Sequence, residues 1–258
     1  MAGGVLHDHE PLGRVPFSEV IAKSSNIGTA KIAQRLGPER LRRAITAFGF
    51  GQKTGIDLGG EAAGRVAPLD RWSKRSAATI AIGQEIMVTT VQLAAAYAAV
   101  ANGGRLVTPH VVAHVRGADG RGVAGAAPPA SGRRVMSERT AALMARLLEG
   151  VVGEDGSGAL AAVEGVRVAG KTGTAQQVDP DTGRYSMDRE TASFIGFAPS
   201  QRPVVVIAVV LDNPRGRGWG GRAAAPVFSR VAEASLRYLS APPVSPAPQD
   251  GLLRVAWR

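Results

Sequence analysis

The sequence predicts an α+β domain in which helices pack on an antiparallel sheet. Helical stretches come first along the chain, and three strand candidates follow one another nearer its end, over 166–175, 191–199 and 204–212. A parallel return would need a crossover of about a dozen or more ordered residues, so the connections between these strands favour antiparallel neighbours. Helices, then consecutive strands, then a closing helix are typical of the α+β class.

The first helical signals precede the strands. A short amphipathic stretch covers 16–23, and a second helix covers 27–36 and ends at the Gly-Pro pair 37–38. A third helix is expected over 38–48, with proline at its first position. Residues 49–64 hold glycines among polar residues and are expected to form a loop with short extended pieces.

Three later segments complete the pattern. Residues 90–102 are apolar nearly all round, so this helix is expected to be buried. The stretch 117–133 is rich in Gly, Ala and Pro and is expected to be a surface insertion, and Ser137 is predicted to cap the helix that follows it. The closing helix, 224–239, is expected to bury four side chains: Val227, Phe228, Val231 and Leu236.

Composition excludes several classes of function. The 258 residues carry 31 Lys and Arg against 21 Asp and Glu, a net charge of +10, but the arginines are scattered and do not alternate with aromatics. No nucleic-acid surface is therefore predicted. The absence of cysteine excludes thiolate catalysis, zinc–cysteine sites and disulfides. The wholly apolar run at 204–211 is far shorter than the roughly 20 residues that span a bilayer.

Two histidine pairs are candidate metal ligands. His7 and His9 lie in a predicted loop, whereas His110 and His114 span a predicted strand, where positions four apart are separated by about 13 Å. Cysteine is absent and no carboxylate cluster accompanies either pair. The sequence therefore predicts neither a metal nor a cofactor.

The segment Ser24-Ser25-Asn26 opens the second helix. Taken alone, it is best interpreted as an ordinary helix N-cap, because serine and asparagine side chains accept hydrogen bonds from free backbone N–H groups there.

The segment Lys171-Thr172-Gly173-Thr174 lies on a predicted strand. Glycines weaken a strand interior unless another group must approach the backbone closely, and a ligand along this edge would be such a group. The lysine supplies a cation, the threonines supply hydroxyls, and the backbone of an edge could pair with an extended peptide. A plain strand with a surface lysine is an equally good interpretation of these four residues alone.

Ser-x-Asn and Lys-Thr-Gly together belong to the signature set of penicillin-binding proteins and serine β-lactamases, whose third member is Ser-x-x-Lys. The chain resembles the class B penicillin-binding proteins, the peptidoglycan D,D-transpeptidases, from about Phe17 to Leu239. Further segments that carry the resemblance are 81–85, 89–94, 101–104 with Pro109, and 193–199. The resemblance implies the penicillin-binding protein transpeptidase or serine β-lactamase-like fold over residues 1–240, followed by a Pro-rich tail over 241–258.

The resemblance also implies an activity. In this family a serine attacks the D-Ala-D-Ala amide of a stem peptide, releases D-Ala, and passes the acyl group to an amine of a neighbouring strand, and β-lactams mimic the donor. Carried over by motif, Ser24 would relay protons and Asn26 would hold the substrate and the catalytic lysine. Lys171 would supply positive potential for the substrate carboxylate, and Thr172 and Thr174 would donate hydrogen bonds to it. Gly173 would contribute to substrate binding, and the Thr174 N–H would form half of the oxyanion hole.

One member of the signature set is missing. No serine in the sequence is followed by lysine three positions later, and only 23 residues precede Ser24. We therefore expect a transpeptidase domain that lacks its amino-terminal part, is inactive alone, and exposes an apolar face that disfavours independent folding. The implied partners are stem peptides, β-lactams and proteins of cell-wall assembly.

Two alternatives stay open. The chain could be a non-catalytic module that binds a peptide or β-lactam or takes part in cell-wall assembly, or it could be a serine β-lactamase or sensor of the same fold. The family works outside the cytoplasmic membrane on an amino-terminal anchor. Because residues 1–10 lack the pattern of a secretory signal, a cytoplasmic location is expected for the chain as written.

Overall fold

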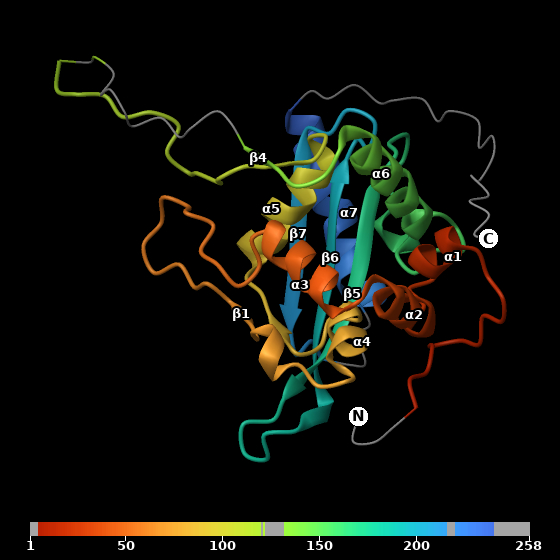
Figure 1. Ribbon diagram of the computed structural model, residues 1–258. Helices are drawn as coiled ribbons and strands as arrows, with labels where there is room; N and C mark the ends of the chain where they lie inside the picture. Colours follow the sequence, from red (N-terminus) through yellow and green to blue (C-terminus); the bar gives the residue numbers. More distant parts are fainter. Residues whose placement is uncertain (1–4, 120, 122–131, 216–219, 240–258) are drawn as a thin grey trace.

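A three-stranded antiparallel sheet forms the centre of the computed structural model (Figure 1). Its strands are β5 (Ala169–Val178), β6 (Tyr185–Ala198) and β7 (Val205–Asp212), hydrogen-bonded in the order β5-β6-β7. The predicted antiparallel arrangement is confirmed, and β5 forms one edge of this sheet. The structure describes residues 5–119, 121, 132–215 and 220–239.

The hairpin between β5 and β6 extends further than the sequence predicts. The pairing continues to Val178 and Tyr185, with a shift in register after Gln176. Asp179 closes the turn, because its Oδ1 accepts hydrogen bonds from the backbone N–H and the hydroxyl of Thr182 at 2.8 and 3.0 Å. These bonds hold the pKa of Asp179 below its usual value. The closed turn explains why β6 begins before residue 191.

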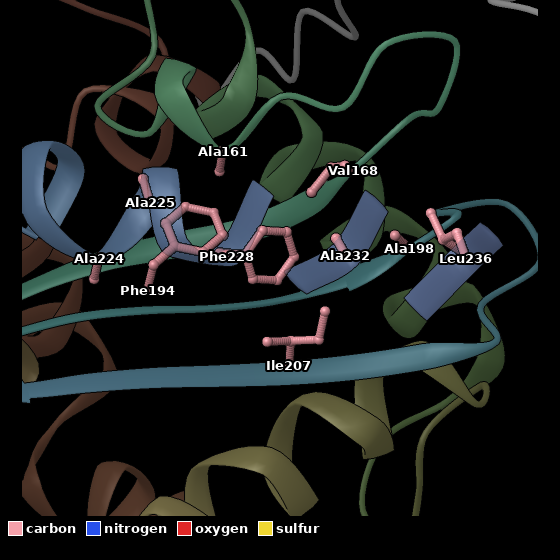
Figure 2. Packing of buried hydrophobic residues seen from close by; sticks show 10 residues of the cluster. All are labelled: Ala161, Val168, Phe194, Ala198, Ile207, Ala224, Ala225, Phe228, Ala232 and Leu236. Atoms are coloured by element: carbon pink, nitrogen blue, oxygen red, sulfur yellow. The ribbon is translucent and has the colours of Figure 1, made fainter. Parts of the chain in front are cut away.

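Helix α7 (Gly220–Tyr238) covers one face of the sheet. Figure 2 shows the cluster between them, in which the rings of Phe194 and Phe228 lie 4.7 Å apart at an angle of 58°. The predicted burial of Phe228 and Leu236 is confirmed, whereas the prediction for Val227 and Val231 is wrong, since both are 41% exposed. Three alanines face the sheet instead and let the helix approach it closely: Ala224, Ala225 and Ala232.

The opposite face of the sheet packs against α5 (Thr90–Ala101) and α6 (Glu138–Val152). Ser137 caps α6 as predicted, since its side chain accepts a hydrogen bond from the N–H of Thr140. Helix α5 begins with a reciprocal capping box between Thr89 and Gln92. On this face Leu148 of α6 packs with Ala169 and Phe197 of the sheet.

Helix α5 is only partly buried, against the sequence-based expectation. Its Gln92, Ala95, Ala96 and Ala99 are buried, but another side borders an open apolar groove next to β7. The groove is lined by Thr90, Val91, Ala94, Ala95, Ala98, Val107, Pro109, Val206 and Ala208. Although this part of the molecule is apolar, no helix among the described residues is both long enough and apolar enough to span a membrane.

The amino-terminal helices are α1 (Phe17–Ala22), α2 (Asn26–Leu36) and α3 (Pro38–Ala47), close to the predicted ranges. Helix α4 (Ser76–Ala81) packs against α2, and α1 packs against α6. The remaining short elements are β1 (Arg65–Val66), η1 (Leu69–Arg71), β2 (Ile86–Met87), β3 (Arg105–Leu106), β4 (Arg133–Arg134) and η2 (Ala159–Ala161). Most of the predicted insertion at 117–133 and the tail at 241–258 lie outside the described residues.

The predicted strand between His110 and His114 is wrong, because this segment is irregular. The carboxylate of Asp57 accepts hydrogen bonds from the backbone N–H groups of Val111 and Val112, at 2.7 and 2.8 Å. Backbone donors that are bound by a side chain cannot serve a sheet ladder. The same two bonds hold the pKa of Asp57 below its usual value.

Candidate functional site

The Ser24–Asn26 segment lies at the junction of α1 and α2. Ser25, rather than Ser24, is the N-cap of α2, since its Oγ accepts a hydrogen bond from the N–H of Gly28 at 2.9 Å. Ser25 is buried, whereas Ser24 is exposed and has a φ of +57°. This left-handed conformation costs about 1–2 kcal/mol for a residue with a Cβ, and such strain gathers at functional sites. Ser25 therefore serves as the helix cap, whereas Ser24 is the serine to which the motif assigns a functional role.

Asp8 holds this junction from outside, and sequence reasoning missed it. Its Oδ2 accepts a hydrogen bond from Ser25 Oγ and its Oδ1 accepts one from the N–H of Ile27, both at 2.9 Å. The Asn26 side chain donates to the carbonyl of His7 at 3.0 Å. The carboxylate also lies at the amino end of a helix, where the helix dipole favours negative charge. The conformation around Ser24 and Asn26 thus depends on residues 7 and 8.

Lys171 lies on β5, on the side of the sheet that α6 covers. Because side chains alternate along a strand, Lys171 shares a face with Ala169, which packs with Leu148 and Phe197. Ile21, at the end of α1, packs on the same cluster. The helix junction that carries Ser24 and the strand that carries Lys171 therefore border the same part of the molecule.

The ammonium group of Lys171 is held over the free edge of β5, which pairs with no other strand among the described residues. Its Nζ donates to the carbonyl and to the hydroxyl of Thr172, at 3.2 and 3.1 Å. Burial lowers the pKa of Lys171 to about 8, so most molecules keep the charge at neutral pH. Both acceptors are neutral, which leaves the positive charge available for an anion.

Thr172 and Thr174 project from β5 towards the start of α7. The N–H of Gly220 donates to Thr174 Oγ1 at 3.0 Å, and Ser157 Oγ lies 3.0 Å from Thr172 Oγ1, within hydrogen-bond distance. In an antiparallel pair, a residue that is not hydrogen-bonded to the neighbouring strand turns its N–H and its carbonyl outward. The contact from Lys171 Nζ to the Thr172 carbonyl indicates that Thr172, and two residues later Thr174, turn these groups to the free edge.

The two glycines of this strand are explained by internal packing. A Cβ on Gly170 would lie 2.5 Å from Cζ of Phe194, and one on Gly173 would lie 2.4 Å from Ser193 Oγ. The ring of Phe194 thus occupies the space beside Gly170. Gly173 stays a predicted substrate-binding position on the strand that carries the cation and hydroxyls.

This edge has the chemistry of a carboxylate-binding site. It combines one cation, two hydroxyls and outward-facing backbone groups, and it could pair with an extended peptide by strand addition. The His, Asp and Glu side chains of the described residues form no cluster of three or more that could hold a metal ion.

Comparison with known proteins places the chain in a family. Residues 5–233 match the family model of the penicillin-binding protein transpeptidase domain. Penicillin-binding protein PbpB of Mycobacterium tuberculosis is 39% identical over 98% of this chain, and stage V sporulation protein D of Bacillus subtilis is 42% identical over 90%. A crystal structure of penicillin-binding protein 3 from M. tuberculosis, complexed with ampicillin, superposes with a TM-score of 0.86 at 37% identity and covers 98% of this chain.

The fold and the edge strand define a domain of the serine β-lactamase-like class. More narrowly, the chain belongs to the penicillin-binding protein transpeptidase-domain family, as the resemblance implied. It spans 38% of the length of PbpB, 35% of stage V sporulation protein D, and 57% of the matched chain of penicillin-binding protein 3.

Proposed function

We propose that this chain supplies the carboxylate-binding and proton-handling half of a D,D-transpeptidase site that cross-links peptidoglycan stem peptides. The proposal rests on the edge of β5, where the half-buried cation of Lys171 lies beside the Thr172 hydroxyl. A stem peptide that ends in D-Ala-D-Ala offers a terminal carboxylate and an extended backbone, which match this edge. β-Lactams carry a carboxylate in a similar position.

Each residue has a defined task in this proposal. Lys171 attracts the substrate carboxylate, and the hydroxyls of Thr172 and Thr174 donate hydrogen bonds to it. The outward N–H of Thr174 stabilises the oxyanion that forms when a serine oxygen adds to the peptide carbonyl. Ser24 passes the serine proton towards the departing D-Ala amine, and the Asn26 side chain orients the peptide. An amine of a second stem peptide then takes the acyl group from the serine.

The attacking serine is not assigned to this chain, because no serine in it is followed by lysine three positions later. Loss of the nucleophile from a serine acyl-transfer site leaves only the residual rate due to binding and the oxyanion site. We therefore propose that the 258-residue chain binds peptide without forming an acyl-enzyme. On its own, the chain would therefore act as a non-catalytic module that binds peptide.

Equilibrium binding tests the proposal. The chain is titrated with an acetylated peptide that ends in D-Ala-D-Ala, and the same peptide with L-Ala-L-Ala is the matched control. We expect saturable binding of the D,D peptide that Lys171→Met abolishes, and no increase in mass after incubation with penicillin. Equal binding of both peptides, or no binding of either, overturns the proposed specificity, and a covalent penicillin adduct overturns the half-site.

A further inference from the structure

Ser157 lies between the two motifs and contacts both elements that carry them. Its backbone N–H donates to the carbonyl of Ala22 at 2.9 Å, two residues before Ser24. Its Oγ lies 3.0 Å from Thr172 Oγ1. The loop that carries Ser157 follows α6, so this residue joins the end of α1 to β5.

The loop around Ser157 is tightly packed, which fixes the serine in place. A Cβ on Gly156 would lie 2.1 Å from the carbonyl oxygen of Val151, and one on Gly158 would lie 2.7 Å from the ring of Phe194. A Cβ on Gly221, in the first turn of α7, would lie 2.3 Å from the carbonyl oxygen of Ser157. Glycines at these positions let α6, β5 and α7 converge on one serine.

The hydrogen bonds of Thr172 give the Ser157 hydroxyl a chemical consequence. A threonine hydroxyl has one proton and two acceptor positions. Lys171 Nζ, which can only donate, fills one acceptor position of Thr172 Oγ1. If Ser157 Oγ donates to the other position, Thr172 keeps only its proton for a ligand. A hydroxyl in this state suits a carboxylate, which only accepts hydrogen bonds, and does not suit an amide nitrogen.

We propose that Ser157 is a positioning residue of the carboxylate site: its hydroxyl makes Thr172 an obligate hydrogen-bond donor, while its backbone ties β5 to the Ser24–Asn26 junction. The inference rests on the proposed function and extends it, because it assigns the preference for a free carboxylate to a residue outside both motifs. Ser157 itself does not touch the peptide. It acts through the Thr172 hydroxyl.

Peptide binding provides the first test. The 258-residue chain and its variants are titrated with the acetylated D-Ala-D-Ala peptide as the free acid and as the carboxyl-terminal amide. We expect Ser157→Ala to weaken binding of the free acid about fivefold and to leave binding of the amide unchanged. Ser157→Thr, which keeps the hydroxyl, should restore the preference. An equal loss for both peptides indicates a merely structural role and overturns the inference.

A double-mutant cycle sharpens this test. If Ser157 acts through Thr172, then Ser157→Ala has no further effect in the Thr172→Val background. Multiplicative losses contradict the inference. Ser229→Ala is the matched control, because the Ser229 hydroxyl donates at 2.6 Å to the carbonyl of Ala162 instead.

A ligand-free measurement separates failure of the inference from failure of the proposed function. Three-bond couplings to the Thr172 methyl report its χ1 rotamer by NMR. We expect one rotamer in the parent chain, in Ser157→Thr and in Ser229→Ala, and averaged rotamers in Ser157→Ala. If the parent chain binds neither peptide, the proposed function fails. Averaged Thr172 rotamers in Ser157→Ala, and in no other variant, would still support the hydrogen bond between Ser157 and Thr172. A single Thr172 rotamer in Ser157→Ala overturns the inference.

Discussion

The backbone N–H of Gly220 donates a hydrogen bond of 3.0 Å to Thr174 Oγ1, which ties the first turn of α7 to the edge strand β5. The bond fills one acceptor position of the Thr174 hydroxyl and leaves its proton free to donate. It also requires a close approach of two backbones, since a Cβ on Gly220 would lie 2.3 Å from the carbonyl oxygen of Gly173. The helix that buries the core cluster therefore also shapes the candidate site.

Substitution of Gly220 tests this close approach. In Gly220→Ala the new Cβ meets two backbone carbonyls, those of Gly173 and Ser193, which cannot rotate away. We expect a loss of about 1–3 kcal/mol in the free energy of unfolding, measured by urea denaturation, together with weaker peptide binding. Gly59→Ala is the control, because a Cβ on Gly59 has no atom within 4 Å and should change stability little. If both variants have the same free energy of unfolding, the close approach of α7 to β5 at Gly220 is contradicted.

Binding of the D-Ala-D-Ala peptide should depend on pH through Lys171. Burial lowers the pKa of this ammonium group to about 8, so the cation is present below that pH and is lost above it. If the cation alone attracts the carboxylate, affinity is highest near pH 7 and falls about tenfold by pH 9. Isothermal titration calorimetry at several pH values measures this profile. Lys171→Arg should remove the fall over this range, and a flat profile in the parent chain would contradict the assignment.

Asp8 should stabilise the amino end of α2. In Asp8→Ala the Ser25 hydroxyl and the Ile27 N–H lose their shared carboxylate partner. We expect the free energy of unfolding to fall by about 0.5–2 kcal/mol, the usual range for loss of a helix cap. Asp8→Asn, which keeps one acceptor oxygen, should lose less. Asp119→Ala is an exposed control that should stay within about 0.5 kcal/mol of the parent chain.

Glu85 combines a strained backbone with bonds from its side chain. Its φ is +58°, and its carboxylate accepts hydrogen bonds from the hydroxyls of Ser76 and Thr79 at 2.7 and 2.5 Å. Its N–H donates to the hydroxyl of Tyr185 at 3.1 Å, which joins this loop to the β5–β6 hairpin.

Two substitutions of Glu85 separate the backbone effect from the side-chain effect. Both Glu85→Ala and Glu85→Gly lose the carboxylate, but only glycine adopts a positive φ at no steric cost. We therefore expect Glu85→Ala to be less stable than Glu85→Gly by about 1 kcal/mol in urea denaturation. The reverse order would show that the backbone at residue 85 is not strained.

The elements of the fold were largely predictable because proline, glycine and apolar periodicity mark them locally. Pro16 precedes α1, Gly37 and Pro38 mark the boundary between α2 and α3, and apolar runs mark the second half of β6 and most of β7. The buried face of α7 was only half predicted. Apolar size favoured the valines at 227 and 231, but close packing against Phe194 selected the small alanines.

The candidate site was predictable as two motifs but not as a structure. Ser24–Asn26 and Lys171–Thr174 carry recognisable chemistry in the sequence, whereas the groups that hold them lie far along the chain. Asp8 is 17 residues from Ser25, Ser157 is 15 from Thr172, and Gly220 is 46 from Thr174. Hydrogen bonds over such separations depend on how the helices and strands pack, and no local sequence pattern predicts them.

In the proposed function, the Ser24–Asn26 junction and the edge of β5 form one peptide-binding site. The most direct test is an NMR titration of the 258-residue chain with the D-Ala-D-Ala peptide, followed at the Asn26 side-chain amide and at the backbone amides of Gly173 and Thr174. We predict that all three signals shift with a single dissociation constant. Shifts confined to one of the two elements, or to the apolar groove between α5 and β7, would contradict the claim.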